Sequence, residues 1–162
     1  ARYAVLAGNF LNAETAYAFG LITHLVDQNY VAKTISDIIT GGKPENKFRH
    51  EPIDNENKNV IFAKKYYSDD NIKQILDGSK PNNIQGLDEN MILRQMKSIS
   101  YTAPIALEIA ADLLEIANSE NISLTDGLSQ ELSNLERIFS TKDAYEGLSS
   151  LIEGRRPSYT NS

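Results

Sequence analysis

The sequence contains no cysteine and only two histidines among its 162 residues. The absence of cysteine excludes a disulfide framework, a cysteine-ligated zinc or iron–sulfur site, and a thiol nucleophile. With His24 and His50 as its only imidazoles, the chain is not expected to build a histidine-rich metal site either. The sequence therefore predicts no metal site and no cysteine-based catalysis.

Long apolar runs and an excess of positive charge are also missing. No apolar stretch approaches the roughly 20 residues that a membrane-spanning helix needs, and no signal-peptide pattern is present. The formal net charge is −6, whereas proteins that bind nucleic acid or anionic membranes usually carry a surplus of Lys and Arg. We therefore expect a soluble cytoplasmic protein with neither a nucleic-acid nor a membrane partner.

Hydrophobic residues make up 41% of the chain, which is enough to bury a core of about one domain. The first residues have a helical apolar pattern that ends at Gly8-Asn9, a pair that favours the left-handed turn closing a helix. No Ser, Thr, Asp or Asn precedes this pattern, although helix starts usually attract such a cap. We therefore expect the helix to begin upstream and the chain to be a fragment.

Residues 12–40 have the pattern of a helix, a strand and a second helix. Asn12 is a good N-cap and Gly20 suits a helix end, while "LITHLV" alternates between two faces. His24 is interpreted as a strand residue because no second metal ligand lies nearby at a suitable spacing. The expected elements are helices over 13–19 and 27–40 with a strand over 21–26 between them.

The segment 41–59 is rich in Gly, Pro, Asn and charge, and predicts a solvated loop. Two short helices are expected between residues 60 and 78. Val60, Ile61 and Tyr67 are predicted to face inward, and Asp69 or Asp70 to cap the second helix.

The last third of the sequence is the most regular and predicts four further helices. Their signals are the apolar spacing of residues 87–99, Pro104 in a first turn, Ser123 with Asp126 as a capping box, and Thr141 or Ser140 as a final cap before Gly154. The expected fold is mainly α, with one short strand near the N-terminus. We divide it into 1–40, an inserted loop with helices over 41–86, and a C-terminal helical region over 87–162.

General acid–base catalysis needs titratable groups that converge on a pocket, and no such constellation is visible in the sequence. Glu131 and Glu136 share a helix but point in different directions. Arg155-Arg156, between Gly154 and Pro157, is the best candidate for a ligand contact because paired guanidinium groups suit a phosphate. An ordinary solvated tail is the alternative interpretation.

Three stretches in order resemble the crotonase superfamily, which contains enoyl-CoA hydratases, enoyl-CoA isomerases and acyl-CoA hydrolases. The first is "VLAGNFLNAETAYAFGLITHLV", the second "SYTAPIALEIAADLL", and the third "LERIFSTKDAYEGLSSLIEGRRPSY". The resemblance implies that this chain corresponds to the C-terminal helical region of a crotonase-like fold, which covers the acyl-CoA site and makes trimer contacts. It also implies that the catalytic groups lie in an N-terminal half preceding Ala1, so no catalytic residue is assigned here.

The same resemblance assigns contacts with coenzyme A. The aromatic residue that touches coenzyme A corresponds to Leu135 or Phe139, and the basic residue that meets its phosphate corresponds to Gly154, beside Arg155 and Arg156. The implied substrate is a coenzyme A thioester and the implied assembly is a homo-oligomer, a trimer or a dimer of trimers. The chain itself is not expected to bind a cofactor. NAD is expected as a cofactor only if a 3-hydroxyacyl-CoA dehydrogenase domain is fused to the chain.

The closing segment is more similar to enoyl-CoA hydratases than to the hydrolases, which implies hydration of trans-2-enoyl-CoA in fatty-acid β-oxidation. The helices expected from "FAKKYYSDDNIKQIL" are instead similar to 3-hydroxyisobutyryl-CoA hydrolases. A third interpretation is a non-catalytic helical module that only oligomerises. The fragment alone is expected to be inactive.

Overall fold

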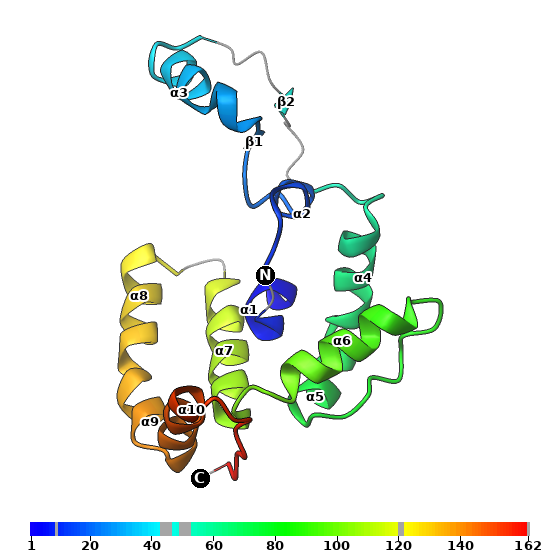
Figure 1. Cartoon of the computed structure of the whole chain (residues 1–162), viewed down its shortest axis with the longest axis vertical. Helices are drawn as coiled ribbons and strands as arrows, with labels where there is room; N and C mark the ends of the chain where they lie inside the picture. The colour runs from blue at the N-terminus through cyan, green and yellow to red at the C-terminus, as the bar shows by residue number, and fades with distance from the viewer. Residues whose placement is uncertain (9, 43–46, 49–52, 120–121, 162) are drawn as a thin grey trace. The chain divides into compact units, whose positions relative to one another are not determined.

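The computed structural model describes residues 1–8, 10–42, 47–48, 53–119 and 122–161 (Figure 1). The chain divides into two compact units, one made of Ala1–Asn9 with Lys65–Ser162 and the other of Phe10–Lys64. Helices dominate both units. The predicted mainly α fold with a short strand near the N-terminus is confirmed.

The unit of residues 10–64 combines helices with a small strand pair. Asn12 caps its first helix as predicted, because its side-chain oxygen accepts a hydrogen bond from the backbone N–H of Thr15 at 2.8 Å. The elements are α2 (Ala13–Ala18), β1 (His24–Leu25), the one-turn 3-10 helix η1 (Gln28–Tyr30), α3 (Val31–Ile39), β2 (Lys47–Phe48) and α4 (Lys58–Tyr66), whose final residues belong to the other unit.

The strand is shorter than predicted, because only His24 and Leu25 of residues 21–26 are in β structure. They pair antiparallel with Phe48 and Lys47, respectively. This partner lies within the segment 41–59 that was predicted to be loop, part of which is outside the described residues. Pairing with a second segment is what makes these residues a strand, because strand residues exchange backbone N–H and C=O hydrogen bonds with a neighbour.

The unit of residues 1–9 and 65–162 is a set of helices arranged around α7. Within it, α7 contacts α1, α5 and α8, and its Leu107 and Ile109 are buried. Pro104 is the first residue of α7, as predicted. The helices are α1 (Arg2–Ala7), α5 (Asp69–Leu76), α6 (Glu89–Ile99), α7 (Pro104–Ala117), α8 (Leu124–Ser133), α9 (Leu135–Phe139) and α10 (Lys142–Glu153) (Figure 1).

The long helix expected to start at Ser123 and run through Phe139 is divided at Asn134 into α8 and α9. The side chains of Ser133 and Asn134 both donate hydrogen bonds to the carbonyl oxygen of Gln130, at 2.8 and 2.9 Å. Such bonds compete with the helical backbone pattern and favour a break. The start of α8 is as predicted, because Ser123 Oγ accepts from the backbone N–H of Asp126 at 3.1 Å.

Two details of the region from residue 60 to residue 78 were predicted wrongly. Ile61 is 49% exposed, whereas its neighbours Val60 and Phe62 are buried. Adjacent helical residues point about 100° apart, so a narrow buried face cannot take every apolar residue in a row. The residue that precedes α5 is Ser68, and the two aspartates proposed as its cap lie inside the first helical turn.

A buried amide holds the start of α5 to the loop that follows this helix. Asn71 is fully buried, and its side-chain nitrogen donates to the carbonyl oxygens of Lys65 at 3.0 Å and Asn83 at 3.1 Å. Its side-chain oxygen accepts from the backbone N–H of Asn83 at 3.2 Å. The buried amide therefore has its hydrogen-bonding capacity used by three backbone groups, two of them on Asn83.

We expect Asn71→Ala to lower the free energy of unfolding by about 2–3 kcal/mol, because the substitution removes three hydrogen bonds made by a fully buried side chain. Urea denaturation of the purified protein measures the loss. Asn82→Ala, which truncates an exposed asparagine in the same loop, is the matched control and should change the unfolding free energy little. Equal effects of the two substitutions would contradict the role given to Asn71.

Candidate functional site

The four residues assigned by resemblance to coenzyme A contacts lie in two places of the same unit. Leu135 and Phe139 are on α9, where they are 45% and 66% exposed. Arg155 and Arg156 follow the C-terminus of α10, which ends at Gly154 in the left-handed conformation. Both pairs are therefore at the surface and accessible to a ligand.

The guanidinium group of Arg155 is occupied by two carboxylates of α10. Its two terminal nitrogens donate to Glu146 at 2.5 and 2.8 Å, and its Nε donates to Glu153 at 2.5 Å. These hydrogen bonds raise the pKa of Arg155. The hydrogen bonds from Arg155 and from the backbone of Ser158 lower the pKa of Glu146 to about 2. Arg155 is thus committed to the protein's own structure.

Arg156 is in a different environment. Its guanidinium carbon lies 5.3 Å from the ring centroid of Tyr101, over the aromatic face, which is a cation–π arrangement. The structure shows no carboxylate paired with Arg156 among the described residues. Its N–H groups therefore remain the better donors for an anionic ligand.

Two carboxylates of α10 hold the residues that follow this helix. We call this arrangement, Asp143 and Glu146 together with residues 155–161, the C-terminal clamp. Asp143 is 1% exposed and accepts hydrogen bonds from the backbone N–H groups of Thr160 at 2.7 Å and Asn161 at 2.8 Å. It also accepts from the hydroxyl of Thr160 at 3.3 Å. Glu146 accepts from the backbone N–H of Ser158 at 2.8 Å. Both carboxylates thus bind backbone rather than substrate.

A glycine on α10 makes room for the aromatic ring of this tail. A Cβ atom at Gly147 would lie 3.2 Å from the hydroxyl oxygen of Tyr159, which is tighter than most contacts of this kind. Burial, followed by the charges of Asp143 and Glu146, raises the pKa of Tyr159. The phenol therefore stays neutral where it rests against α10.

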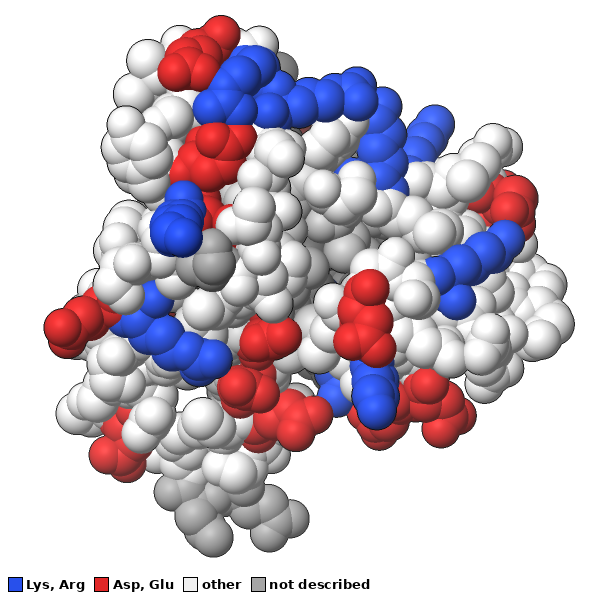
Figure 2. All heavy atoms as spheres, turned by 90° about the horizontal axis from the view of Figure 1, so that it is seen from below, with Lys and Arg blue, Asp and Glu red and all other residues white. Residues whose placement is uncertain are grey.

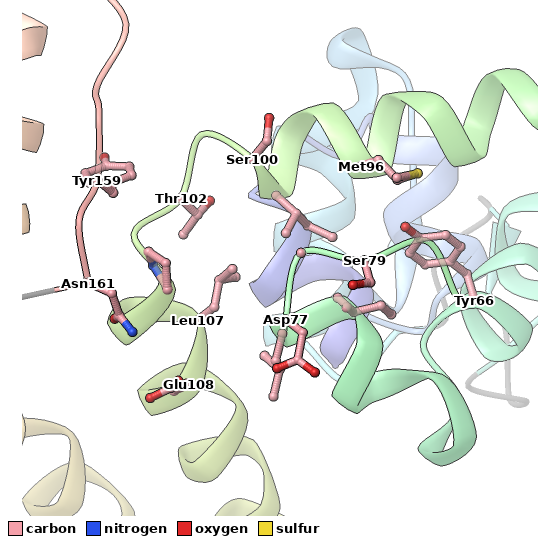
Figure 3. A pocket seen from close by; sticks show the side chains of 15 residues that line it. Tyr66, Asp77, Ser79, Met96, Ser100, Thr102, Leu107, Glu108, Tyr159 and Asn161 are labelled. Atoms are coloured by element: carbon pink, nitrogen blue, oxygen red, sulfur yellow. The ribbon is translucent and has the colours of Figure 1, made fainter. Parts of the chain in front are cut away.

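The same tail forms one wall of a cavity of about 440 Å³. The other walls come from the end of α5 and the turn after it, the end of α6, and the first turns of α7. Figure 3 shows Tyr159 and Asn161 on the opposite side of the cavity from Tyr66 and Met96. None of the four residues assigned to coenzyme A lines this cavity.

The helices α8, α9 and α10 expose large apolar side chains, which we call the α8–α10 apolar face. Along α8 these side chains recur every four residues, so they form one stripe. The exposed fractions on α10 reach 78% at Leu151 and 86% at Ile152. The residues of the face are Leu124, Leu128, Leu132, Leu135, Phe139, Tyr145, Leu148, Leu151 and Ile152.

Charges of both signs are interspersed on the face of the molecule drawn in Figure 2. Across the part of the chain that the structure describes, no three His, Asp or Glu side chains are grouped so that they could hold a metal ion. Within the same residues, no helix is both long enough and apolar enough to cross a bilayer.

Sequence reasoning identified Arg155 and Arg156 but missed the clamp and the cavity. A local signal for the clamp was available, because Asp143 and Glu146 are three residues apart and so share one face of a helix. The cavity left no comparable signal, since its walls come from four separate segments of the chain. Those segments meet only through the packing of α5, α6 and α7.

The clamp should weaken in acid, because the pKa of Glu146 is about 2 in the folded protein and 4.5 when unperturbed. A carboxylate whose pKa is lowered by folding stabilises the folded state above its unfolded pKa, and this contribution is lost as the pH falls through its folded value. We therefore expect hydrogen-exchange protection of the Ser158 amide to be complete above about pH 4.5 and to fall towards pH 2.

In Glu146→Gln this protection should already be reduced at pH 6. Glu89→Gln, which removes the carboxylate partner of Lys80 elsewhere in the same unit, should leave the Ser158 amide unchanged. If the Ser158 amide is as well protected from hydrogen exchange in Glu146→Gln as in the wild-type protein at pH 6, then the ionised carboxylate of Glu146 does not hold the tail.

Comparison with protein-family models identifies the chain over its whole length. A model described as enoyl-CoA hydratase/isomerase matches residues 1–162. A search of curated proteins gave no match, and a search of solved structures gave none. The match confirms the crotonase resemblance carried by the three sequence motifs. The chain belongs to the enoyl-CoA hydratase/isomerase family.

Proposed function

We propose that this chain is the C-terminal helical region of an enzyme that hydrates trans-2-enoyl-CoA thioesters in fatty-acid β-oxidation. The observation that carries the proposal is the family match over residues 1–162. The end of the closing segment, "EGLSSLIEGRRPSY" over residues 146–159, favours a hydratase within this family because its sequence is more similar to the hydratases than to the hydrolases.

In this reaction water adds across the α,β double bond of the thioester. Backbone N–H donors polarise the thioester oxygen, and carboxylates move the proton. The carboxylates of the clamp do not suit this second role, because Asp143 is buried beneath the tail and Glu146 is engaged by Arg155. We therefore assign the acid–base groups to the part of the fold that precedes this region, and assign to this chain the binding of coenzyme A.

Two exposed features support a contact with coenzyme A. Arg156 offers a guanidinium group with no carboxylate partner among the described residues, and guanidinium groups bind phosphate well. Leu135 and Phe139 offer exposed apolar surface on α9 for the adenine ring. Of the two arginines we prefer Arg156, because two carboxylates already bind Arg155.

One structural observation favours a second candidate, a 3-hydroxyisobutyryl-CoA hydrolase. The sequence "FAKKYYSDDNIKQIL", which is similar to those enzymes, does form helices, namely the end of α4 and all of α5. The hydrolase would cleave the thioester and release free coenzyme A, whereas the hydratase leaves the thioester intact. The two candidates are therefore separable by product.

We further propose that the protein is a cytoplasmic homo-oligomer, a trimer or a dimer of trimers. The many exposed apolar side chains of α8, α9 and α10 support this assembly, because burying them against another subunit would remove them from water. A second copy of the chain would remove these side chains from water and gain the corresponding hydrophobic free energy.

To test activity, the purified full-length protein is assayed with two substrates, crotonyl-CoA and 3-hydroxyisobutyryl-CoA, and loss of the enoyl thioester and release of free thiol are measured. We expect loss of the enoyl thioester without release of free thiol from the first, and no reaction with the second. Thiol release from 3-hydroxyisobutyryl-CoA would identify the hydrolase instead. No turnover of either would favour a non-catalytic helical module. The 162-residue chain alone should show no turnover.

The test of assembly is multi-angle light scattering over a range of concentrations. We expect the full-length protein to be oligomeric and Leu151→Glu to shift it towards monomer, because a carboxylate in an apolar interface is desolvated without a partner. Leu93→Glu is the matched control, since Leu93 is 55% exposed on α6, outside the α8–α10 apolar face. Monomeric wild-type protein at every concentration would overturn the proposed assembly.

A further inference from the structure

The cavity behind the C-terminal tail has the volume of a small-molecule site. Its volume of about 440 Å³ lies within the range that such sites usually have, roughly 300–1,000 Å³. Its lining is mixed, and its apolar part comes from the partly exposed side chains of Leu76, Met96 and Pro104, which we call the apolar floor. This apolar floor gains free energy when a ligand with an apolar body displaces water from it.

The charge around the cavity is of one sign. Asp77, in the turn after α5, and Glu108, on α7, both line it, and the lining contains no lysine, arginine or histidine. In Figure 3 both carboxylates lie below the side chain of Leu107. Neither carboxylate forms an ion pair that the structure shows among the described residues. This arrangement repels anions and attracts cations.

An aromatic ring adds a second attraction for positive charge. Tyr159 lines the cavity and is partly exposed, whereas Tyr66, which also lines it, is only 1% exposed. The ring that a ligand can reach is therefore that of Tyr159. The faces of neutral aromatic rings attract ammonium groups, most strongly where water is excluded.

The wall of the cavity that the C-terminal tail forms is held in place by hydrogen bonds within the protein. Asp143 binds the backbone N–H groups of Thr160 and Asn161, while Glu146 binds that of Ser158. Tyr159 lies between these anchored residues and is positioned by them. A preorganised wall reduces the entropic cost of binding.

From this combination we propose that the cavity binds a small organic cation, an ammonium group carried on an apolar body. Such a ligand places its apolar part on the apolar floor, and its charge near Asp77, Glu108 and the ring of Tyr159. The site goes beyond the proposed hydratase function, because coenzyme A carries negatively charged phosphates that this lining disfavours. It is therefore a second site on the same unit.

The test compares three ligands that share a benzyl or phenyl body: benzyltrimethylammonium, benzyl alcohol and benzoate. Binding to the purified full-length protein is followed by NMR chemical-shift titration. We expect the cation to bind at least about tenfold more tightly than the alcohol, and benzoate to bind most weakly. The affinity for the cation should fall as salt is added, since salt screens the attraction of exposed carboxylates.

Two variants test the carboxylates, with a third as matched control. Asp77→Asn and Glu108→Gln should each weaken binding of the cation about two- to fivefold, the range expected for exposed charge pairs, and leave benzyl alcohol unaffected. Asp112→Asn changes the net charge equally, about one turn further along α7 at an exposed position outside the cavity lining. It should leave the affinity for the cation unchanged.

The proposal is overturned if no ligand binds, if the alcohol binds as tightly as the cation, or if Asp112→Asn weakens cation binding as much as Glu108→Gln does. These readouts involve no coenzyme A thioester. Failure of the cation site is therefore distinguishable from failure of the proposed hydration reaction.

Discussion

The apolar surface of α7 is the constraint around which its unit is organised. Its apolar residues are not confined to one stripe, so one packing partner cannot cover the helix. Three helices contact it: α1 and α5 from earlier parts of the sequence, and α8, which directly follows it. The N-terminal segment is drawn into the same unit as the C-terminal half for this reason, and the first turns of α7 become a wall of the cavity.

The elements that the sequence predicts well are those with local signals. Asn12, Ser123 and Thr141 cap helices through hydrogen bonds to backbone groups three residues away, and Gly154 ends α10 with φ of 65°. Each of these features depends on a few consecutive residues. They could be identified from the printed sequence without any knowledge of tertiary contacts.

The features that sequence reasoning missed depend on partners far away in the chain. The strand at His24 depends on its pairing with Lys47–Phe48 in another segment of the chain, and Ile61 is exposed because its neighbours take the buried face of α4. The candidate site follows the same rule. The two arginines could be identified from their type and position, but the glutamates that occupy Arg155 and the tyrosine beneath Arg156 required the fold.

The carboxylates of the closing segment have a structural role and not a catalytic one. Its carboxylates are used to satisfy backbone N–H groups of an irregular tail, which would otherwise need water or regular secondary structure. A charged acceptor makes these hydrogen bonds stronger than neutral ones.

The contact between Gly147 and Tyr159 links the sequence of α10 to the size of the cavity on the other side of the tail. A Cβ atom at position 147 would press on the phenol hydroxyl, which would have to shift away from the helix by a few tenths of an ångström. Since the ring of Tyr159 lines the cavity, the missing side chain at position 147 helps to fix where one wall stands, although α10 itself does not line the cavity. A change at this single position would therefore displace that wall while every residue of the lining stays the same.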